Sequence, residues 1–349
     1  MNAQVEVVAM GARTPVGLTA ASSAASVRAG ISRYAEYPFI DLRGERVVVA
    51  ADALLTTRLE GRERLLPMAE SVLDELEAEL GEKVLYGGRL TVLLALPETR
   101  PGFSENDAAW VVQSLEARLS RKTSKVSVEL AGRGHSGAIL AVEQVVKECS
   151  EGRDNLFLVV GADSYHHPET FVWLEQCRRF AQPGVRSGFV PGEGAGGLAL
   201  MSAGLRRRLG FPSGAIVRGA CTAQEARLRD SETGSLGVGM TQAVQGAVAR
   251  LDLATESVDT VYADINGERY RSEEWGFVAL RAPKVWKGPS YKAPSDCWGD
   301  MGAAFGALGG VLAIQSFARG YARGPRALVM AGSDSGLRGA MLLEAPRAA

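Results

Sequence analysis

The most specific motif of this 349-residue chain is RSGFVPGEGAG, residues 186–196. We expect Gly192, Gly194 and Gly196 to allow positive φ angles and to let neighbouring backbone approach where a Cβ would collide. The letters GEGAGG also satisfy the dinucleotide pattern G-x-G-x-x-G. In that motif the glycines open a helix whose N-terminus holds the phosphates, whereas here they lead into the apolar strand GLALMS (197–202). We therefore exclude a nicotinamide site and expect no cofactor.

Buried strands and covering helices alternate on both sides of this stretch. The first half is expected to contain strands at 5–10, 89–96, 125–130, 156–162 and 197–202, and helices near 66–80 and 138–146. From about residue 214 the order recurs, with strands at 215–220, 260–265, 327–332 and 340–344 and helices at 241–251 and 302–314. Two such halves predict an α/β fold in which sheets are stacked between helical layers.

Three stretches resemble the β-ketoacyl-[acyl carrier protein] synthases in order and spacing across nearly the whole chain. MGARTPVG (10–17) resembles the opening of that family, and residues 186–196, after Gly161-Ala162-Asp163, resemble its GFV-x-GEGAG element. GDMGAAFG (299–306) is similar to its GH-x-x-AA-x-G helix start. The resemblance implies a thiolase-like, five-layer αβαβα fold built from two duplicated halves, which we place at 1–205 and 206–349.

The condensation chemistry of that family uses a cysteine and two histidines, and this sequence matches none of them. The thiolate holds an acyl group, and the imidazoles stabilise charge that develops on the second substrate. The family turn Cys-x-x-Gly corresponds to GHSG here, so that Gly134 takes the place of the cysteine. Asn266 takes the place of the first histidine and Asp300 that of the second. Ser295 matches a family lysine, for which Lys292 is the only nearby substitute.

An aspartate in place of a histidine reverses the charge offered to an oxyanion. Loss of even one good oxyanion donor costs roughly 3 kcal/mol, so we expect no condensation activity. The glycine-rich loop that carries a gating phenylalanine in the family reads GSDSG here (332–336). The fold should bring Asn266, Asp300 and Asp334 to one pocket, where we favour hydrogen bonding among them over ligand binding.

The turn that begins at Gly134 also resembles the G-x-S-x-G elbow of α/β-hydrolases, with Ser136 as the nucleophile. A hydrolase triad then needs a histidine after the serine. The histidines of the chain are His135, His166 and His167, so one of the last two would have to act from an unusual place. We favour the simpler interpretation, in which Ser136 caps the following helix.

A second polar group, formed by Asp163, His166, His167 and Glu169, has the residue types of a metal site. Adjacent histidines in a loop point in different directions, and His-His-Pro is typical of a surface turn, so we expect no metal. The candidate pocket residues are therefore His135, Ser136, Glu193, Asn266, Asp300 and Asp334.

The composition and charge of the chain argue against nucleic-acid and membrane partners. A net charge of -1 and a pI near 6.4 provide no global field for nucleic acid or anionic lipid, and the run Arg206-Arg207-Arg208 is typical of a solvated turn. The longest weakly polar stretch, 301–314, is shorter than the roughly 18 residues of a membrane span. The four cysteines form no CxxC pair and no signal peptide is evident, so we expect a cytoplasmic protein without nucleic-acid or membrane partners.

Three functions remain open. The first is a non-catalytic subunit, scaffold or adaptor; the resemblance implies a homodimer, or a heterodimer with an active synthase, paired through a central strand of the first half. An acyl carrier protein or another protein would be a further partner. The second is an acyl transferase or thioester hydrolase of fatty-acid or polyketide-type metabolism that uses Ser136 or His135. The third is a module that binds an acyl chain.

Overall fold

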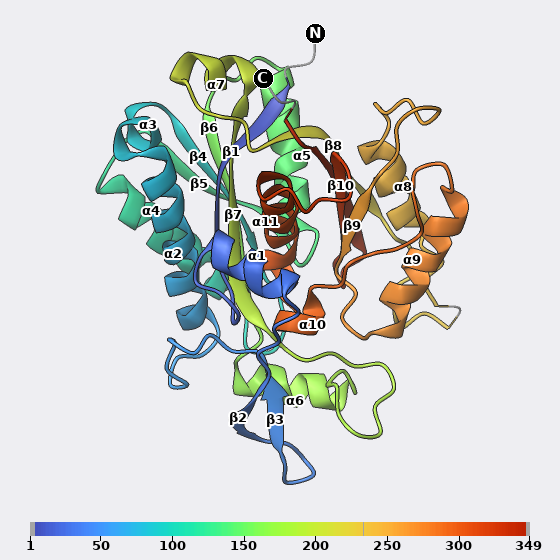
Figure 1. Cartoon of the computed structure of the whole chain (residues 1–349). Helices are drawn as coiled ribbons and strands as arrows, with labels where there is room; N and C mark the ends of the chain where they lie inside the picture. Colours follow the sequence, from blue (N-terminus) through green and yellow to red (C-terminus); the bar gives the residue numbers. More distant parts are fainter. Residues whose placement is uncertain (1–3, 233, 347–349) are drawn as a thin grey trace.

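A computed structural model describes residues 4–232 and 234–346. The first half contributes β1 (Val5–Arg13), β4 (Leu90–Leu96), β5 (Val126–Arg133), β6 (Leu156–Ser164) and β7 (Glu193–Ser202). These strands lie in the order β5-β4-β6-β7-β1 (Figure 1). β4 runs parallel to β5 and β6, whereas β7 is antiparallel to both β6 and β1.

The second half repeats this order with one strand fewer. β8 (Ala215–Gln224), β9 (Thr260–Ala263), β10 (Arg326–Gly332) and β11 (Leu337–Glu344) lie in the order β8-β11-β10-β9. β11 is antiparallel to both of its neighbours, as β7 is in the first half. The first half has its outermost strand, β5, at the corresponding edge. Beyond β9, the described residues form isolated parallel bridges at Trp286 and Lys292 in its place. The repeated order confirms the predicted duplication of the fold.

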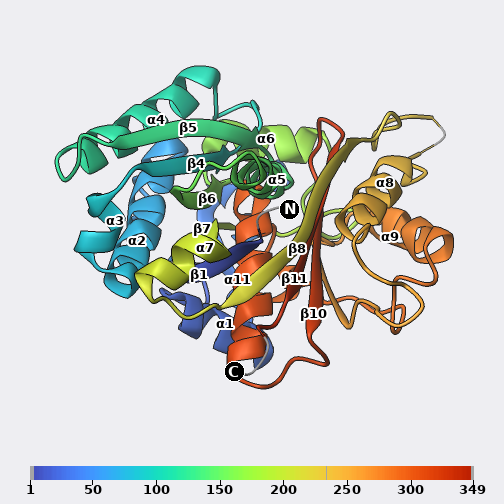
Figure 2. The same ribbon diagram turned by 90° about the horizontal axis from the view of Figure 1, so that it is seen from above.

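Helices form three layers around these strands (Figures 1 and 2). α5 (Gly137–Ser150) and α11 (Phe305–Ala318) lie in the middle and pack against strands of both halves. α2 (Arg62–Leu80) and α4 (Glu105–Ser120) cover the outer face of the first half, and α8 (Val238–Ala247) and α9 (Arg269–Arg281) that of the second. The two sheets join through three antiparallel residue pairs between β1 and β8, and the five predicted layers are confirmed.

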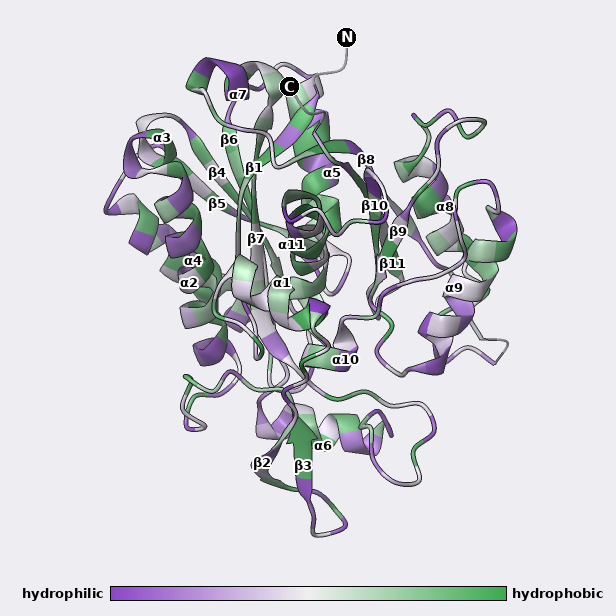
Figure 3. Ribbon diagram, in the orientation of Figure 1, coloured by the Kyte–Doolittle hydropathy of each residue, from purple (hydrophilic) through white to green (hydrophobic). Residues whose placement is uncertain are grey.

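The middle helices are more hydrophobic than the outer helices, because they are covered by strands on both sides (Figure 3). Every residue of α11 from Phe305 to Ile314 is buried, because strands lie on both sides of it. The outer helices bury only one face, as α2 does with Leu65, Val72 and Leu76. Within the described residues, none of the helices combines the length and apolar character that a membrane crossing requires.

The remaining elements are short. They are α1 (Ala20–Arg28), β2 (Ala35–Ile40), β3 (Arg46–Val49), α3 (Glu82–Gly87), α6 (Pro168–Gln176), α7 (Ala203–Leu209), α10 (Ser295–Trp298) and a 3₁₀ turn at Gly302–Ala304. β2 and β3 form a separate two-stranded sheet that packs with α6 around Phe171, a small lobe for which we made no sequence prediction.

The glycines of residues 186–196 allow neighbouring backbone to pack closely against this segment. A Cβ at Gly192 would lie 2.5 Å from the carbonyl oxygen of Trp298, and one at Gly196 would lie 2.9 Å from the backbone nitrogen of Leu308. The expected positive φ angles are wrong, because none of Gly192, Gly194 and Gly196 has a positive φ. The chain is extended there and enters β7, so the missing Cβ, and not an unusual backbone angle, is what the fold requires.

We predict that Gly196→Ala destabilises the protein by about 1–3 kcal/mol, because the added methyl group would push α11 away from β7. Urea unfolding followed by circular dichroism measures the change. Gly204→Ala is the matched control, since a Cβ there meets nothing closer than 3.6 Å. Equal stability of Gly196→Ala and the wild type would contradict the close-approach argument.

Candidate functional site

The turn between β5 and α5 opens onto a cavity of about 340 Å³. Its lining combines carboxylates, a guanidinium group, an imidazole and two aromatic rings: Glu98, Thr99, Arg100, Gly134, His135, Asp163, Tyr165, Trp173, Asp334 and Ser335. The cavity therefore adjoins Gly134, which the resemblance matches to the nucleophilic cysteine.

A side chain at Gly134 would collide with the side chains of Ser333 and Glu98 where they now lie. Its φ is +65°, and a Cβ built on it would lie 2.8 Å from Ser333 Oγ and 2.9 Å from the carboxyl carbon of Glu98. A nucleophile at this position would therefore have to overcome both an unfavourable backbone angle and two close neighbours.

Ser136 is fully buried and engaged with the β10–β11 hairpin. Its hydroxyl group donates to the carbonyl oxygen of Ala331 at 2.7 Å, and its backbone N–H donates to Ser333 Oγ at 3.0 Å. The serine occupies the N-cap position of α5, but its side chain makes no capping hydrogen bond, so our capping interpretation is wrong. The hydroxyl group serves to join α5 to β10.

His135 and Asp300 form the centre of the site. His135 Nε2 lies 2.9 Å from Asp300 Oδ1, and both side chains are buried. The Asp300 carboxylate also accepts hydrogen bonds from the Tyr165 hydroxyl at 3.0 Å, from the backbone N–H of Gly302 at 2.8 Å and from the Asn266 amide. With four donors around it, this carboxylate is satisfied without any ligand.

The charges of this pair shift both pKa values. Burial disfavours the imidazolium, but the Asp300 carboxylate outweighs burial and raises the pKa of His135 above its ordinary value. Burial likewise disfavours the Asp300 carboxylate, but His135, Arg271 and Asn266 together hold the pKa of Asp300 well below its usual range. Both shifts favour the charged ion pair.

Two arginines that the sequence analysis did not identify complete the network. Arg271 of α9 pairs with Asp264, donates to the carbonyl oxygen of Gly332 at 2.8 Å, and lies 3.3 Å from His135 Nε2. Arg179 binds Glu268 at 2.7 and 3.0 Å. No motif marks either arginine. Arg179 binds residues 89 and 155 positions away, and Arg271 lies beside His135, 136 positions away, although its ionic partners Asp264 and Glu268 are near it in the chain.

The loop at 332–336 is held from both sides. Arg179 binds Asp334 at 2.6 and 3.2 Å. The backbone N–H groups of Asp334 and Ser335 donate to the Glu98 carboxylate at 2.9 and 3.0 Å. Burial opposes the charged form of Asp334, but Arg179 holds the pKa of this carboxyl well below its usual range.

Glu193 belongs to a different cluster. Arg64 of α2 donates to both of its carboxylate oxygens at 2.6 Å, and both side chains are fully buried. Ser164 donates to it at 2.8 Å, and His166 Nδ1 lies 3.2 Å away. Glu193 does not line the cavity at Gly134; it joins β7 to α2.

The residues of the suspected metal cluster have separate partners. Asp163 pairs with Arg100 at 2.5 Å, His166 lies beside Glu193, and His167 Nδ1 accepts the backbone N–H of Glu169 at 3.2 Å. Within 4–232 and 234–346, no three His, Cys, Asp or Glu side chains gather in a way that could hold a metal ion.

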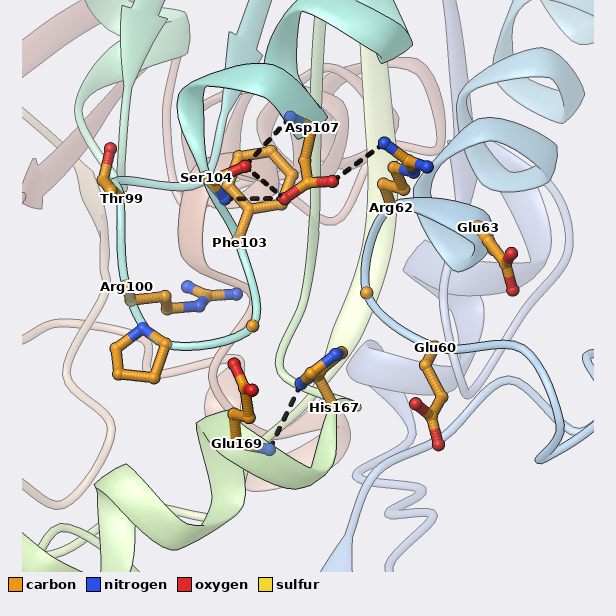
Figure 4. A pocket seen from close by; sticks show the side chains of 13 residues that line it. Glu60, Arg62, Glu63, Thr99, Arg100, Phe103, Ser104, Asp107, His167 and Glu169 are labelled. Carbon is orange, nitrogen blue, oxygen red and sulfur yellow. Dashed lines mark hydrogen bonds and ion pairs between the residues drawn. The ribbon is translucent and has the colours of Figure 1, made fainter.

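His167 and Glu169 line a neighbouring cavity of about 550 Å³, where Arg62 and Asp107 pair on another wall (Figure 4). This cavity shares Thr99 and Arg100 with the one at Gly134. The two hollows are therefore adjacent.

The family lysine has no counterpart beside the Asp300 carboxylate: Ser295 carries no charge, and Lys292 lies elsewhere. Ser295 is buried, and its carbonyl oxygen accepts the Tyr34 hydroxyl at 2.5 Å. The Lys292 ammonium lies over the ring of Tyr262, 5.2 Å from its centroid. The arrangement around Asp300 thus pairs opposite charges within the protein.

We predict that the His135–Asp300 pair contributes most to stability between the ordinary pKa values of the two groups, about 3.8 and 6.5. The raised pKa of His135 makes its contribution disappear as pH rises through the folded value, and the lowered pKa of Asp300 makes its contribution disappear as pH falls. The difference in unfolding free energy between wild type and His135→Gln should therefore shrink from about pH 6 towards pH 9. Urea titrations at each pH measure it.

The control for this experiment is the same His135→Gln change in an Asp300→Asn background, where the pH dependence above pH 6 should be lost. A wild-type difference that stays constant or grows towards pH 9 would contradict the ion pair.

Comparisons with known proteins give fold-level matches only. No protein-family model matches the sequence, and a search of curated proteins finds no match. Among solved structures, a chain of AntDE:AntF, a type II PKS acyl-carrier protein in complex with its ketosynthase, superposes with a TM-score of 0.78 at 15% identity, covering 99% of this chain and 100% of that one.

Two further structures agree. The ketosynthase from module 6 of the bacillaene synthase of Bacillus subtilis 168 gives a TM-score of 0.78 at 14% identity, over 99% of this chain and 72% of that one. The ketosynthase ApeO in complex with its chain length factor ApeC, from Xenorhabdus doucetiae, gives 0.77 at 13% identity, over 99% and 98%. Similarity at this level establishes architecture: the chain has the thiolase-like fold of the ketosynthases.

Proposed function

We propose that this chain is a non-catalytic, ketosynthase-like subunit that pairs with a catalytically active ketosynthase. The observation that carries the proposal is Gly134. It lies in the turn that holds the cysteine in the family it resembles, and Ser333 and Glu98 fill the space that a side chain there would need. The resemblance matches Asp300 to one of the histidines that stabilise an oxyanion, and here Asp300 forms an ion pair with His135 instead.

An acyl transferase or thioester hydrolase that uses Ser136 or His135 is less well supported. The Ser136 hydroxyl donates its proton to a backbone carbonyl, and no hydrogen bond links it to an imidazole. The raised pKa of His135 favours the imidazolium, which cannot accept a proton as a general base. Both groups therefore fit structural roles.

The proposed partner rests on the kind of assembly that the similar structures represent. The Xenorhabdus complex joins a ketosynthase to a chain length factor, and another similar structure, the ishigamide ketosynthase/chain length factor, has a TM-score of 0.69 at 17% identity. A chain with the fold but without the nucleophile suits the second position of such a pair. The AntDE:AntF complex extends the proposal to an acyl carrier protein as a further partner.

The strand order of the sheet indicates where a partner could pair with this chain. The resemblance pointed to a central strand of the first half, but the central strands β6 and β7 are hydrogen-bonded on both sides. Among the described strands of that half, β5 has a free edge, and Leu130 on it is 40% exposed. Strand addition at β5 would extend the sheet into the partner and cover this edge.

We also propose a cytoplasmic location, for which the cysteines provide support. Cys149, Cys177, Cys221 and Cys297 are all free thiols in the structure, as expected of a protein kept in a reducing compartment.

We predict that the purified protein forms no covalent adduct with hexanoyl-coenzyme A, as measured by intact mass. Gly134→Cys should not restore acylation and should lower the unfolding free energy by about 1–3 kcal/mol, since it adds a side chain at a positive φ in a filled space. A stable adduct on the wild type that is lost in Ser136→Ala would support the enzyme instead.

The pairing surface makes a separate prediction. Co-expression with an active ketosynthase of the same genome should yield a complex on size exclusion, and Leu130→Glu should abolish it by placing a carboxylate in the strand interface. Leu280→Glu is the matched control, because Leu280 is 79% exposed on α9, in the opposite outer layer. Loss of the complex in both variants, or in neither, would contradict pairing through β5.

A further inference from the structure

A group of cations lies away from the candidate site, where α1 meets the end of α11. It consists of Arg28, Lys292, Arg319 and Arg323, here called the basic cluster. α1 and α11 lie side by side in both ribbon views (Figures 1 and 2). A cavity of about 570 Å³ opens between them, lined by Ala21, Ala24, Ala25, Arg28, Ala29, Gln315, Arg319 and Tyr321. Two guanidinium groups thus border a hollow whose lining includes four alanines and no carboxylate.

The basic cluster differs from most other cations of this protein in having no ionic partner. In the part of the chain that the structure describes, no carboxylate oxygen lies within 4.0 Å of any of its four charged groups. Arg326, three residues after Arg323, shows the usual pattern and binds Glu256 at 2.6 Å. The net charge of the whole chain is -1, so the cluster is a local concentration of positive charge.

Aromatic rings hold part of the cluster in place. The Arg28 guanidinium lies 4.2 Å from the centroid of the Tyr321 ring, and the Lys292 ammonium lies 6.0 Å from the same ring and 5.2 Å from that of Tyr262. Contacts of this kind stabilise each cation by roughly 0.5–2 kcal/mol and restrict its motion. The lysine backbone is also fixed, since its N–H donates to the carbonyl oxygen of Val261 at 2.8 Å. The positive charges are therefore partly preorganised.

These cations also repel one another. Burial lowers the pKa of Lys292, and the nearby charges of Arg323 and Arg28 lower it further. An anion in the cavity would relieve this repulsion. The cavity and the missing counter-charge both point to an anionic ligand.

The helix ends provide a simpler role for two of the cations. Arg28 is in the last turn of α1 and Arg319 is the C-cap of α11, where the partial negative charge of each helix end favours a cation by about 0.3–1 kcal/mol. The partial negative charge of about one half at each helix C-terminus does not balance the four positive charges of the basic cluster. The helix ends also provide no role for Lys292 or Arg323.

We propose that the basic cluster binds a phosphorylated small molecule in the cavity between α1 and α11. Guanidinium groups match phosphate oxygens with paired N–H donors, and the lysine adds a compact charge. The hollow shape favours a small ligand over the flat surface of an acidic protein, and the alanine side chains leave room for an organic group beside the phosphate. This proposal is independent of the non-catalytic role proposed for the site at Gly134.

Isothermal titration calorimetry of the full chain tests the proposal, with inorganic phosphate, diphosphate and adenosine monophosphate as probes, and sodium chloride at matched ionic strength as the reference. At least one phosphate should bind with a saturable isotherm that chloride does not produce. Arg28→Gln with Arg319→Gln should weaken that binding by at least about tenfold, the effect of losing one charge-assisted hydrogen bond. Equal binding of inorganic and organic phosphate would assign the site to phosphate alone, and tighter binding of adenosine monophosphate would assign it to an organic phosphate.

The matched control is Arg207→Gln with Arg227→Gln, which removes the same charge from two exposed arginines elsewhere. It should leave the affinity within about twofold, because screened surface charges act weakly at a distance. Arg319→Glu is a second variant at the site and should abolish binding while the circular dichroism spectrum is retained. Absence of saturable binding by all three phosphates, or an equal loss in the control, would overturn the proposal.

Discussion

The close contact between β7 and the segment that leads into α11 is the constraint on which the rest of the site depends. Pro191 and Asp300 form a backbone bridge, in which the Asp300 N–H donates to the carbonyl oxygen of Val190 at 2.8 Å and the Gly192 N–H donates to that of Asp300 at 3.0 Å. A Cβ at Gly192 would lie 2.7 Å from the same Asp300 oxygen. The absence of one side chain thus sets the position of the residue that organises the site.

Because Asp300 is buried at this position, its negative charge requires cations and hydrogen-bond donors around it. An isolated carboxylate at 2% exposure would be very costly, so it needs cations and hydrogen-bond donors within contact distance. His135 and Asn266 supply them, and Arg271 adds a buried guanidinium that is shared with Asp264. Such a network favours one arrangement of the loops around the cavity more than it adds to net stability. The hydrogen-bonding groups around Asp300 are thereby satisfied by partners within the protein.

The two charged regions of the molecule contrast in this respect. Around Asp300, each buried charge has a partner of opposite sign. In the basic cluster at α1 and α11, Arg28 and Arg319 have no carboxylate within 4.0 Å among the described residues. Charge that is satisfied internally stabilises an arrangement, whereas charge without a partner beside a cavity is available to a ligand.

The amino-acid sequence alone was enough to predict the layers and to locate Gly134 in the turn before α5. Apolar periodicity located the strands and the buried α11, and the motif order located Gly134, Asn266 and Asp300, because these signals depend on neighbours in the chain. It did not reveal the lobe of β2 and β3, the true role of Ser136, or the partners Arg271 and Arg179. Those features emerge in three dimensions, since an ion pair forms between atoms that are close in space, and nothing in the local pattern around residue 271 indicates that His135, 136 residues away, will lie beside it.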